Sequence, residues 1–110
     1  MDLSNLETKI EIKFKNPEHL QTALTHRSYL NENRSYKLPH NERQEFLGDA
    51  VLELVTTEYL YRNYQNPEGE LTNLRSALVN YRILAEIAGN LGIGEYILLS
   101  VKDTGAGMTP

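Results

Sequence analysis

The sequence contains no cysteine, so disulfides, thiolate metal sites and cysteine nucleophiles are excluded. It also has no apolar run near the roughly 18 residues that a membrane-spanning helix requires. Residues 1–4 include an acidic residue, Asp2, and form no basic segment, so no signal peptide is predicted. Together these absences favour a cytoplasmic protein with no membrane partner.

Positive charge is also scarce. The 110 residues carry 11 Lys and Arg against 15 Asp and Glu, a net charge of −4. Proteins that bind nucleic acid through bulk charge neutralise many phosphates with Lys and Arg, so this class is disfavoured. An acidic cleft that meets phosphates through divalent metal ions fits the composition, and so does mild acidity that only aids solubility. The length allows one small domain.

Helical periodicity dominates the chain, and no segment shows the alternation of a half-buried strand. Residues 1–14 have nearly helical spacing, a short helix is predicted over residues 17–29, and long helices are predicted over residues 42–64 and 71–91. Asn41 is the expected N-cap of the central helix, with Gln44 completing a capping box. Residues 31–40 form a predicted loop, and residues 101–110 have the composition of a flexible or truncated tail. The predicted class is therefore all-α.

Acidic side chains form a stripe along the predicted central helix. At about 100° per residue the stripe spans an arc of roughly 80°. It consists of Glu42, Glu45, Asp49 and Glu53. The other side of the helix is apolar and is predicted to enter the core; it consists of Leu47, Ala50, Val51, Leu54 and Val55.

Such a stripe has a cost, because like charges one turn apart destabilise a helix by roughly 0.2–0.5 kcal/mol per pair. Clustered carboxylate oxygens are the ligands that Mg²⁺ and Mn²⁺ prefer. Spacing alone leaves two interpretations open, a divalent metal site and a chance acidic surface.

Three ordered motifs carry a resemblance to a known family. The segment 40–52, HNERQEFLGDAVL, resembles the ribonuclease III signature, in which leucine usually stands where this chain has Gln44. Residues 24–29 resemble the motif that precedes the signature, and residues 68–80 the motif that follows it. The resemblance extends over roughly residues 5–100.

This resemblance implies an all-α, ribonuclease III-like endonuclease domain that works as a homodimer in RNA processing. Its implied reaction is hydrolysis of phosphodiesters in double-stranded RNA, with Mg²⁺ as cofactor and Mn²⁺ as a substitute. By position, Glu45 and Asp49 are the metal-binding catalytic carboxylates, and Glu42 is a further acidic ligand candidate. Phe46 matches an aromatic residue that inserts into the partner subunit, and Glu68 matches another acidic position near the site.

One motif of the family has no counterpart in this sequence. The family also uses an aspartate and a glutamate from a later helix, and the sequence after residue 100 does not resemble that part. Asp103 is a poor substitute. Residues 1–100 are therefore predicted to be a partial domain without its C-terminal helix and without a double-stranded RNA-binding domain. Weak or absent cleavage by this chain alone is expected.

Three basic or ionisable residues have two interpretations each. His26 and Arg27 either contact RNA phosphate or pack near the signature helix. Arg75 either meets phosphate or pairs with the acidic stripe. Two other functions also remain open for the whole chain: a non-catalytic, dimeric module that binds RNA or the ribosome, and a metal-binding helical protein without an RNA partner.

Overall fold

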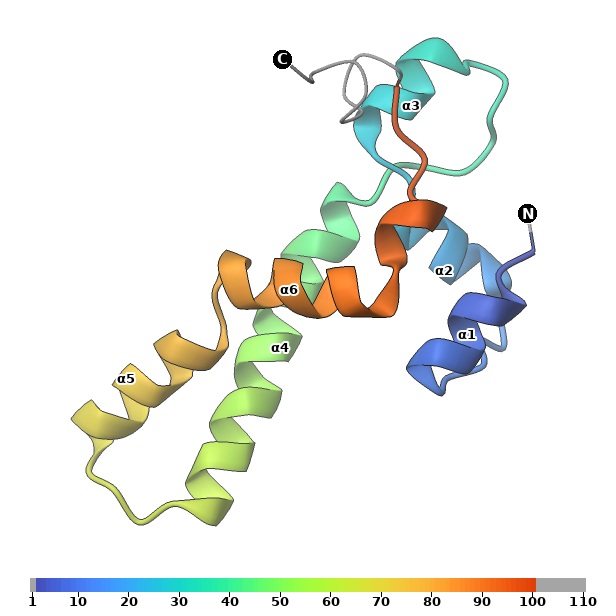
Figure 1. The fold of residues 1–110 in the computed structure, drawn as a ribbon. Coiled ribbons are helices and arrows are strands. Elements are labelled where there is room, and N and C mark those ends of the chain that lie inside the picture. The colour runs from blue at the N-terminus through green and yellow to red at the C-terminus, as the bar shows by residue number, and fades with distance from the viewer. Residues whose placement is uncertain (1, 101–110) are drawn as a thin grey trace, which may run out of the picture.

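The computed structural model describes residues 2–100, and this part of the chain is helical as predicted. Figure 1 shows the elements, which in chain order are α1 (Ser4–Ile10), α2 (Pro17–Ala23), α3 (Arg27–Glu32), α4 (Glu42–Asn63), α5 (Glu68–Leu78), α6 (Tyr81–Leu91) and the 3₁₀ helix η1 (Ile93–Tyr96). The described residues contain no sheet, only one isolated parallel bridge between Thr25 and Leu98.

The core of the described chain lies at one end of the molecule, where α1 and α2 approach the end of α6 and η1 (Figure 1). Its buried members are all leucines, namely Leu3, Leu6, Leu20 and Leu24. Partly buried apolar side chains pack against them: Ile10, Phe14, Ile93 and Tyr96. Residues from both ends of the sequence therefore build one small core.

The helix predicted over residues 17–29 is in fact two helices, so that prediction was wrong. The Leu98 N–H donates to the Leu24 carbonyl at 2.8 Å, and the His26 N–H donates to the Leu98 carbonyl at 2.9 Å. These bonds hold the backbone between α2 and α3 against a segment more than 70 residues later in the chain. His26 then caps α3, with its Nδ1 accepting from the Ser28 N–H. Local periodicity carries no information about such a distant partner.

The helix predicted over residues 71–91 is also interrupted, at Val79 and Asn80. Asn80 has extended backbone angles, and its Oδ1 accepts from the Ile83 N–H at 3.0 Å as the N-cap of α6. Its Nδ2 donates to the carbonyls of Ser76 and Ala77 at the end of α5. One side chain thus satisfies backbone groups of both helices and stabilises the bend between them.

The start of α4 was predicted correctly, but the capping box was not. Asn41 is the N-cap residue, yet its Nδ2 donates to the Ala23 carbonyl at 2.9 Å instead of capping α4. Gln44 likewise turns away, donating from Nε2 to the His19 carbonyl at 3.2 Å. Both side chains therefore fasten α4 to α2.

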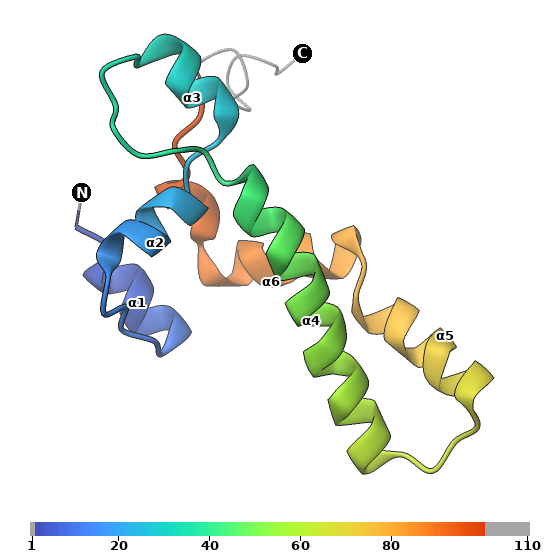
Figure 2. The ribbon, with the colours of Figure 1, turned by 180° about the vertical axis from the view of Figure 1, so that it is seen from behind.

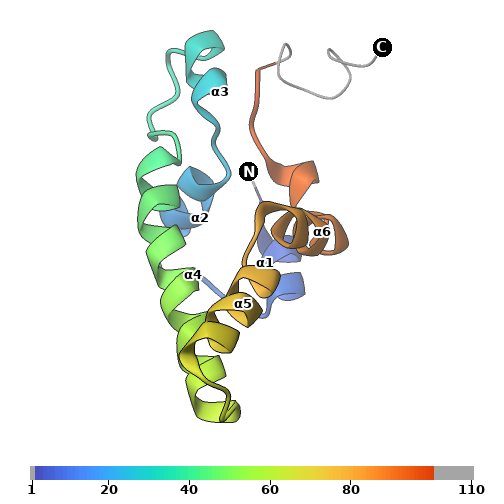
Figure 3. The ribbon, with the colours of Figure 1, turned by 90° about the vertical axis from the view of Figure 1, so that its left-hand side faces the viewer.

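The apolar stripe of α4 is not in a core, contrary to the prediction. Leu60 is the one residue of α4 that is buried among the described residues. Exposure reaches 65% for Leu47, 68% for Leu54 and 60% for Val55. Figures 2 and 3 show why: α4 runs along one edge of the molecule, paired with α5 on one side. The tail predicted at 101–110, with Asp103, lies outside the described residues.

Candidate functional site

Two carboxylates in the middle of the acidic stripe are free of ion pairs. Glu45 and Asp49 lie one turn apart on α4, and both residues are exposed. Neither forms a salt bridge within residues 2–100. Asp49 lines a cavity of about 350 Å³ between α4 and the α5–α6 junction, together with Glu53, Arg75, Ser76 and Val79.

The two outer carboxylates of the stripe are each paired with an arginine from another helix. Arg27 Nη2, at the start of α3, lies 2.6 Å from Glu42 Oε1. Arg75 Nε, on α5, lies 3.6 Å from Glu53 Oε1, while its Nη1 donates to Thr57 Oγ1 at 2.9 Å. Arg27 and Arg75 thus both contact side chains of α4, and their contact with RNA phosphate stays a prediction. His26 caps α3 through its ring Nδ1, and its contact with RNA phosphate also stays a prediction.

The donor chemistry of the two free carboxylates fits a hard divalent cation. Mg²⁺ is commonly held by one or two carboxylates, with water and substrate phosphate filling the other positions. Within residues 2–100 no group of three or more Asp, Glu, His or Cys side chains is arranged to hold a metal. Glu45 and Asp49 can therefore supply a partial, open ligand set and no more.

Glu68 does not share the cavity of Asp49. It is the first residue of α5 and lines a separate cavity with Thr57, Tyr61 and other side chains of the α4–α5 hairpin. The described structure thus brings together Asp49, Glu53 and Arg75, and it leaves Glu68 outside that set.

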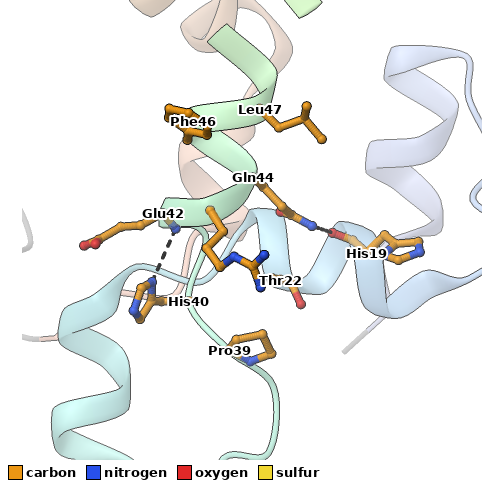
Figure 4. A pocket seen from close by; sticks show the side chains of 9 residues that line it. His19, Thr22, Pro39, His40, Glu42, Gln44, Phe46 and Leu47 are labelled. Atoms are coloured by element: carbon orange, nitrogen blue, oxygen red, sulfur yellow. Dashed lines mark hydrogen bonds between the residues drawn. The ribbon is translucent and has the colours of Figure 1, made fainter. Parts of the chain in front are cut away.

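Phe46 projects from α4 beside a second, larger cavity. The Phe46 residue is 83% exposed and contributes to the wall of a cavity of about 940 Å³. Figure 4 shows Phe46 and Leu47 above the cavity, and Gln44 directed from α4 toward His19 on α2. Gln44 Oε1 is buried and has no hydrogen-bond partner among the described residues. The sequence analysis did not predict that Gln44 attaches α4 to α2. The replacement of the usual leucine by Gln44 was the feature that could have indicated it.

The family model described as Ribonuclease-III-like matches residues 16–109. The chain belongs to this family. Among its relatives, the chain is 54% identical over 101 residues to Ribonuclease 3 of Clostridium tetani, covering 91% of this chain and 42% of the relative. It is 48% identical over 100 residues to Ribonuclease 3 of Oceanobacillus iheyensis, covering 90% of this chain and 44% of the relative. The ribonuclease III-like chain thus spans about two fifths of the length of these relatives.

A solved structure of the same family has the same fold. The nuclease domain of ribonuclease III from Campylobacter jejuni superposes with a TM-score of 0.85 at 42% identity, covering 97% of this chain and 71% of that one. That structure is described as flexible in a region involved in dimer formation. The predicted resemblance and fold class are confirmed.

No helix within residues 2–100 has both the length and the apolar character needed to cross a membrane.

Proposed function

We propose that this chain is the metal-binding portion of an endoribonuclease that cleaves double-stranded RNA. The observation that carries the proposal is the pair of free carboxylates on α4, Glu45 and Asp49, within the family signature. Relatives named Ribonuclease 3 support the reaction class. A cytoplasmic setting remains a prediction from sequence.

The proposed chemistry is metal-assisted hydrolysis of a phosphodiester. A bound Mg²⁺ or Mn²⁺ would make water nucleophilic and stabilise the leaving oxygen. The role of Glu45 and Asp49 is to hold the cation through carboxylate oxygens while leaving positions for water and phosphate. Glu42 and Glu68 are secondary candidates, because Glu42 is already paired with Arg27 and Glu68 lines a different cavity.

We also propose a homodimer in which Phe46 contacts the partner subunit. Exposed aromatic side chains next to a cavity are frequent anchors of protein interfaces. Phe46 has both features, and the apolar side of α4 next to it is exposed. Dimer formation in the related nuclease domain supports this arrangement.

A second candidate function is a dimeric RNA-binding module without catalysis. The pairing of Glu42 with Arg27 and of Glu53 with Arg75 favours it, because it leaves only two carboxylates of the stripe without an ion pair within residues 2–100.

The test combines Mn²⁺ titration with duplex-RNA binding. The free Mn²⁺ signal in electron paramagnetic resonance measures affinity for the wild type, Glu45→Gln and Asp49→Asn. Each substitution should weaken Mn²⁺ binding by roughly tenfold or more. Glu58→Gln is the matched control, since Glu58 lies on the same helix and pairs with Arg62 at 3.8 Å.

RNA binding is measured by gel shift with and without Mg²⁺, followed by analysis of the RNA for cleavage. Retarded duplex that depends on Mg²⁺ and on Asp49 supports the nuclease proposal, and cleaved duplex supports it further. Retardation that is indifferent to Mg²⁺ and Asp49 favours the non-catalytic module. If the chain binds metal but does not retard the duplex even at high protein concentration, the proposal that it binds RNA is wrong.

A further inference from the structure

The large cavity beside Phe46 has a polar wall that neither the proposed metal site nor the proposed dimer contact uses. We propose that this wall binds a phosphate group. The cavity holds about 940 Å³, and pockets for small ligands usually hold about 300–1,000 Å³. Figure 4 shows Phe46 and Leu47 at one end of the cavity and His40 and Pro39 at the other.

The N-terminus of α4 forms one part of this wall. The Asn41 side chain leaves the helix uncapped, because it bonds to the end of α2 instead. The Glu42 N–H donates to His40 Nδ1 at 3.3 Å, but the N–H groups of Arg43 and Gln44 have no hydrogen-bond partner within residues 2–100. Unpaired N–H groups at the start of a helix, together with the helix dipole, favour an anion.

Three basic or ionisable side chains line the same cavity. Arg43 is permanently charged and forms no ion pair with any described residue. His40 accepts through Nδ1, so the proton of its neutral ring lies on Nε2, which can donate. His19 on α2 adds a second imidazole. Glu42 is the one acidic residue in the lining; it is paired with Arg27, and Figure 4 shows its carboxylate directed away from His19.

A buried hydroxyl on α2 indicates a ligand independently of the helix end. Thr22 is only 9% exposed and lines the cavity, yet its Oγ1 bonds to no other residue in the described part of the chain. Thr25, just after α2, bonds its own hydroxyl back to the Gln21 carbonyl at 2.7 Å. Figure 4 shows the Thr22 hydroxyl directed toward Pro39 instead. It can therefore donate to an oxygen that enters the cavity.

These donors come from two helices and the loop between them, and one contact holds them together. Gln44 Nε2 donates to the His19 carbonyl at 3.2 Å and so fixes α4 against α2 at the cavity. Arginine, hydroxyl and backbone N–H donors at a helix N-terminus are the groups that proteins use to bind phosphate. The buried Gln44 Oε1 is an acceptor, so it can bond only to a hydroxyl or water that accompanies the phosphate.

The test is a titration of the whole chain with inorganic phosphate, followed by ¹H–¹⁵N nuclear magnetic resonance at constant ionic strength. EDTA is present, so the outcome does not depend on the proposed metal site. The N–H signals of Arg43 and Gln44 should shift most. Arg43→Gln should weaken phosphate binding by roughly tenfold or more, because it removes the charged donor. Thr22→Val should weaken it by roughly fivefold, because it removes the hydroxyl at nearly equal size.

Arg82→Gln is the matched control. It makes the same charge change on α6, outside this cavity, and should leave the phosphate affinity unchanged. Circular dichroism checks that each variant is folded. If Thr22→Val loses helix, the comparison of Arg43→Gln with Arg82→Gln decides alone.

Inorganic phosphate, a ribonucleotide and the 5′-phosphate end of an RNA strand share the proposed chemistry, and two further titrations distinguish them. Tighter binding of adenosine monophosphate than of inorganic phosphate supports the proposal and identifies a nucleotide ligand. Competition by duplex RNA that requires a 5′-phosphate supports it and identifies an RNA end. Phosphate that shifts no signal of Arg43 or Gln44 overturns the proposal. Equal losses for Arg43→Gln and Arg82→Gln also overturn it, because overall charge would then explain the binding.

Discussion

Gln44 shows how one side chain can join two helices at a cost. Its Nε2 donates to the His19 carbonyl, while its Oε1 is buried with no partner among the described residues. An unpaired buried polar atom costs about 1–3 kcal/mol, whereas a typical hydrogen bond contributes about 0.5–1.5 kcal/mol. A leucine, which is usual at this signature position, would have no unpaired buried oxygen, but it would also lack the hydrogen bond to the His19 carbonyl.

We predict that Gln44→Leu stabilises the chain by about 1 kcal/mol. Thermal unfolding followed by circular dichroism should show a melting temperature higher by roughly 4–8 °C. Gln65→Leu, in the exposed loop between α4 and α5, is the control and should leave the melting temperature nearly unchanged. A lower melting temperature for Gln44→Leu would mean that the bond to His19 outweighs the unpaired oxygen.

For single residues, the sequence predicted which side chains belong to the candidate site, but not which other side chains they pair with. Glu45 and Asp49 were expected as ligands from the stripe and the resemblance, and these remain proposals. The partners of Glu42 and Glu53 could not be chosen from sequence, because Arg27 and Arg75 come from other helices. Which carboxylates stay free depends on where those helices pack.

At the scale of elements, the bend between α5 and α6 depends on Asn80. We predict that Asn80→Ala destabilises the chain by about 1 kcal/mol, since it removes the N-cap of α6 and the bonds to the end of α5. Urea unfolding would measure the loss. Asn90→Ala, within α6, is the control and should have little effect. Equal stability of Asn80→Ala and wild type would show that packing alone maintains the bend.

The end of α6 depends on a glycine in the left-handed region. Gly92 has φ of 67°, and a Cβ there would also lie 3.0 Å from Lys9 Nζ. The lysine end can move, so the backbone angle sets most of the cost. Gly92→Ala should lower the free energy of unfolding by about 1–2 kcal/mol.

Gly94→Ala is the matched control for Gly92→Ala, because nothing lies within 4 Å of a Cβ at Gly94 and its φ is not positive. Urea denaturation of both variants checks the prediction. Similar stabilities for the two variants would argue against a specific conformational requirement at Gly92.

At the scale of the whole molecule, the exposed apolar side of α4 is the main feature. Phe46, Leu47 and Leu54 all exceed 60% exposure. Apolar surface of this kind drives association in water, at roughly 25 cal/mol for each Å² removed from solvent. We therefore expect the chain to self-associate.

Phe46→Asp should weaken self-association by roughly tenfold or more, because it places a charge in the proposed contact. Sedimentation velocity over a range of protein concentrations would measure the monomer–dimer equilibrium. Ile12→Asp is the control, since Ile12 is also exposed but lies after α1. Equal effects of both substitutions, or a wild type that is monomeric at all concentrations, would contradict the role of Phe46.

The sequence by itself determined the helical class, the long central helix and the single side of that helix on which the carboxylates lie. These properties follow from local periodicity and helix geometry, which need no distant partner. Only the tertiary structure decided the breaks at Leu24–His26 and Val79–Asn80, the exposed apolar side of α4 and the pairing of Glu42 and Glu53. The first break depends on a contact between distant residues, Leu98 and Leu24. The ion pairs of Glu42 and Glu53 and the exposure of the apolar side of α4 depend on how the helices pack. A local sequence pattern contains no information about either.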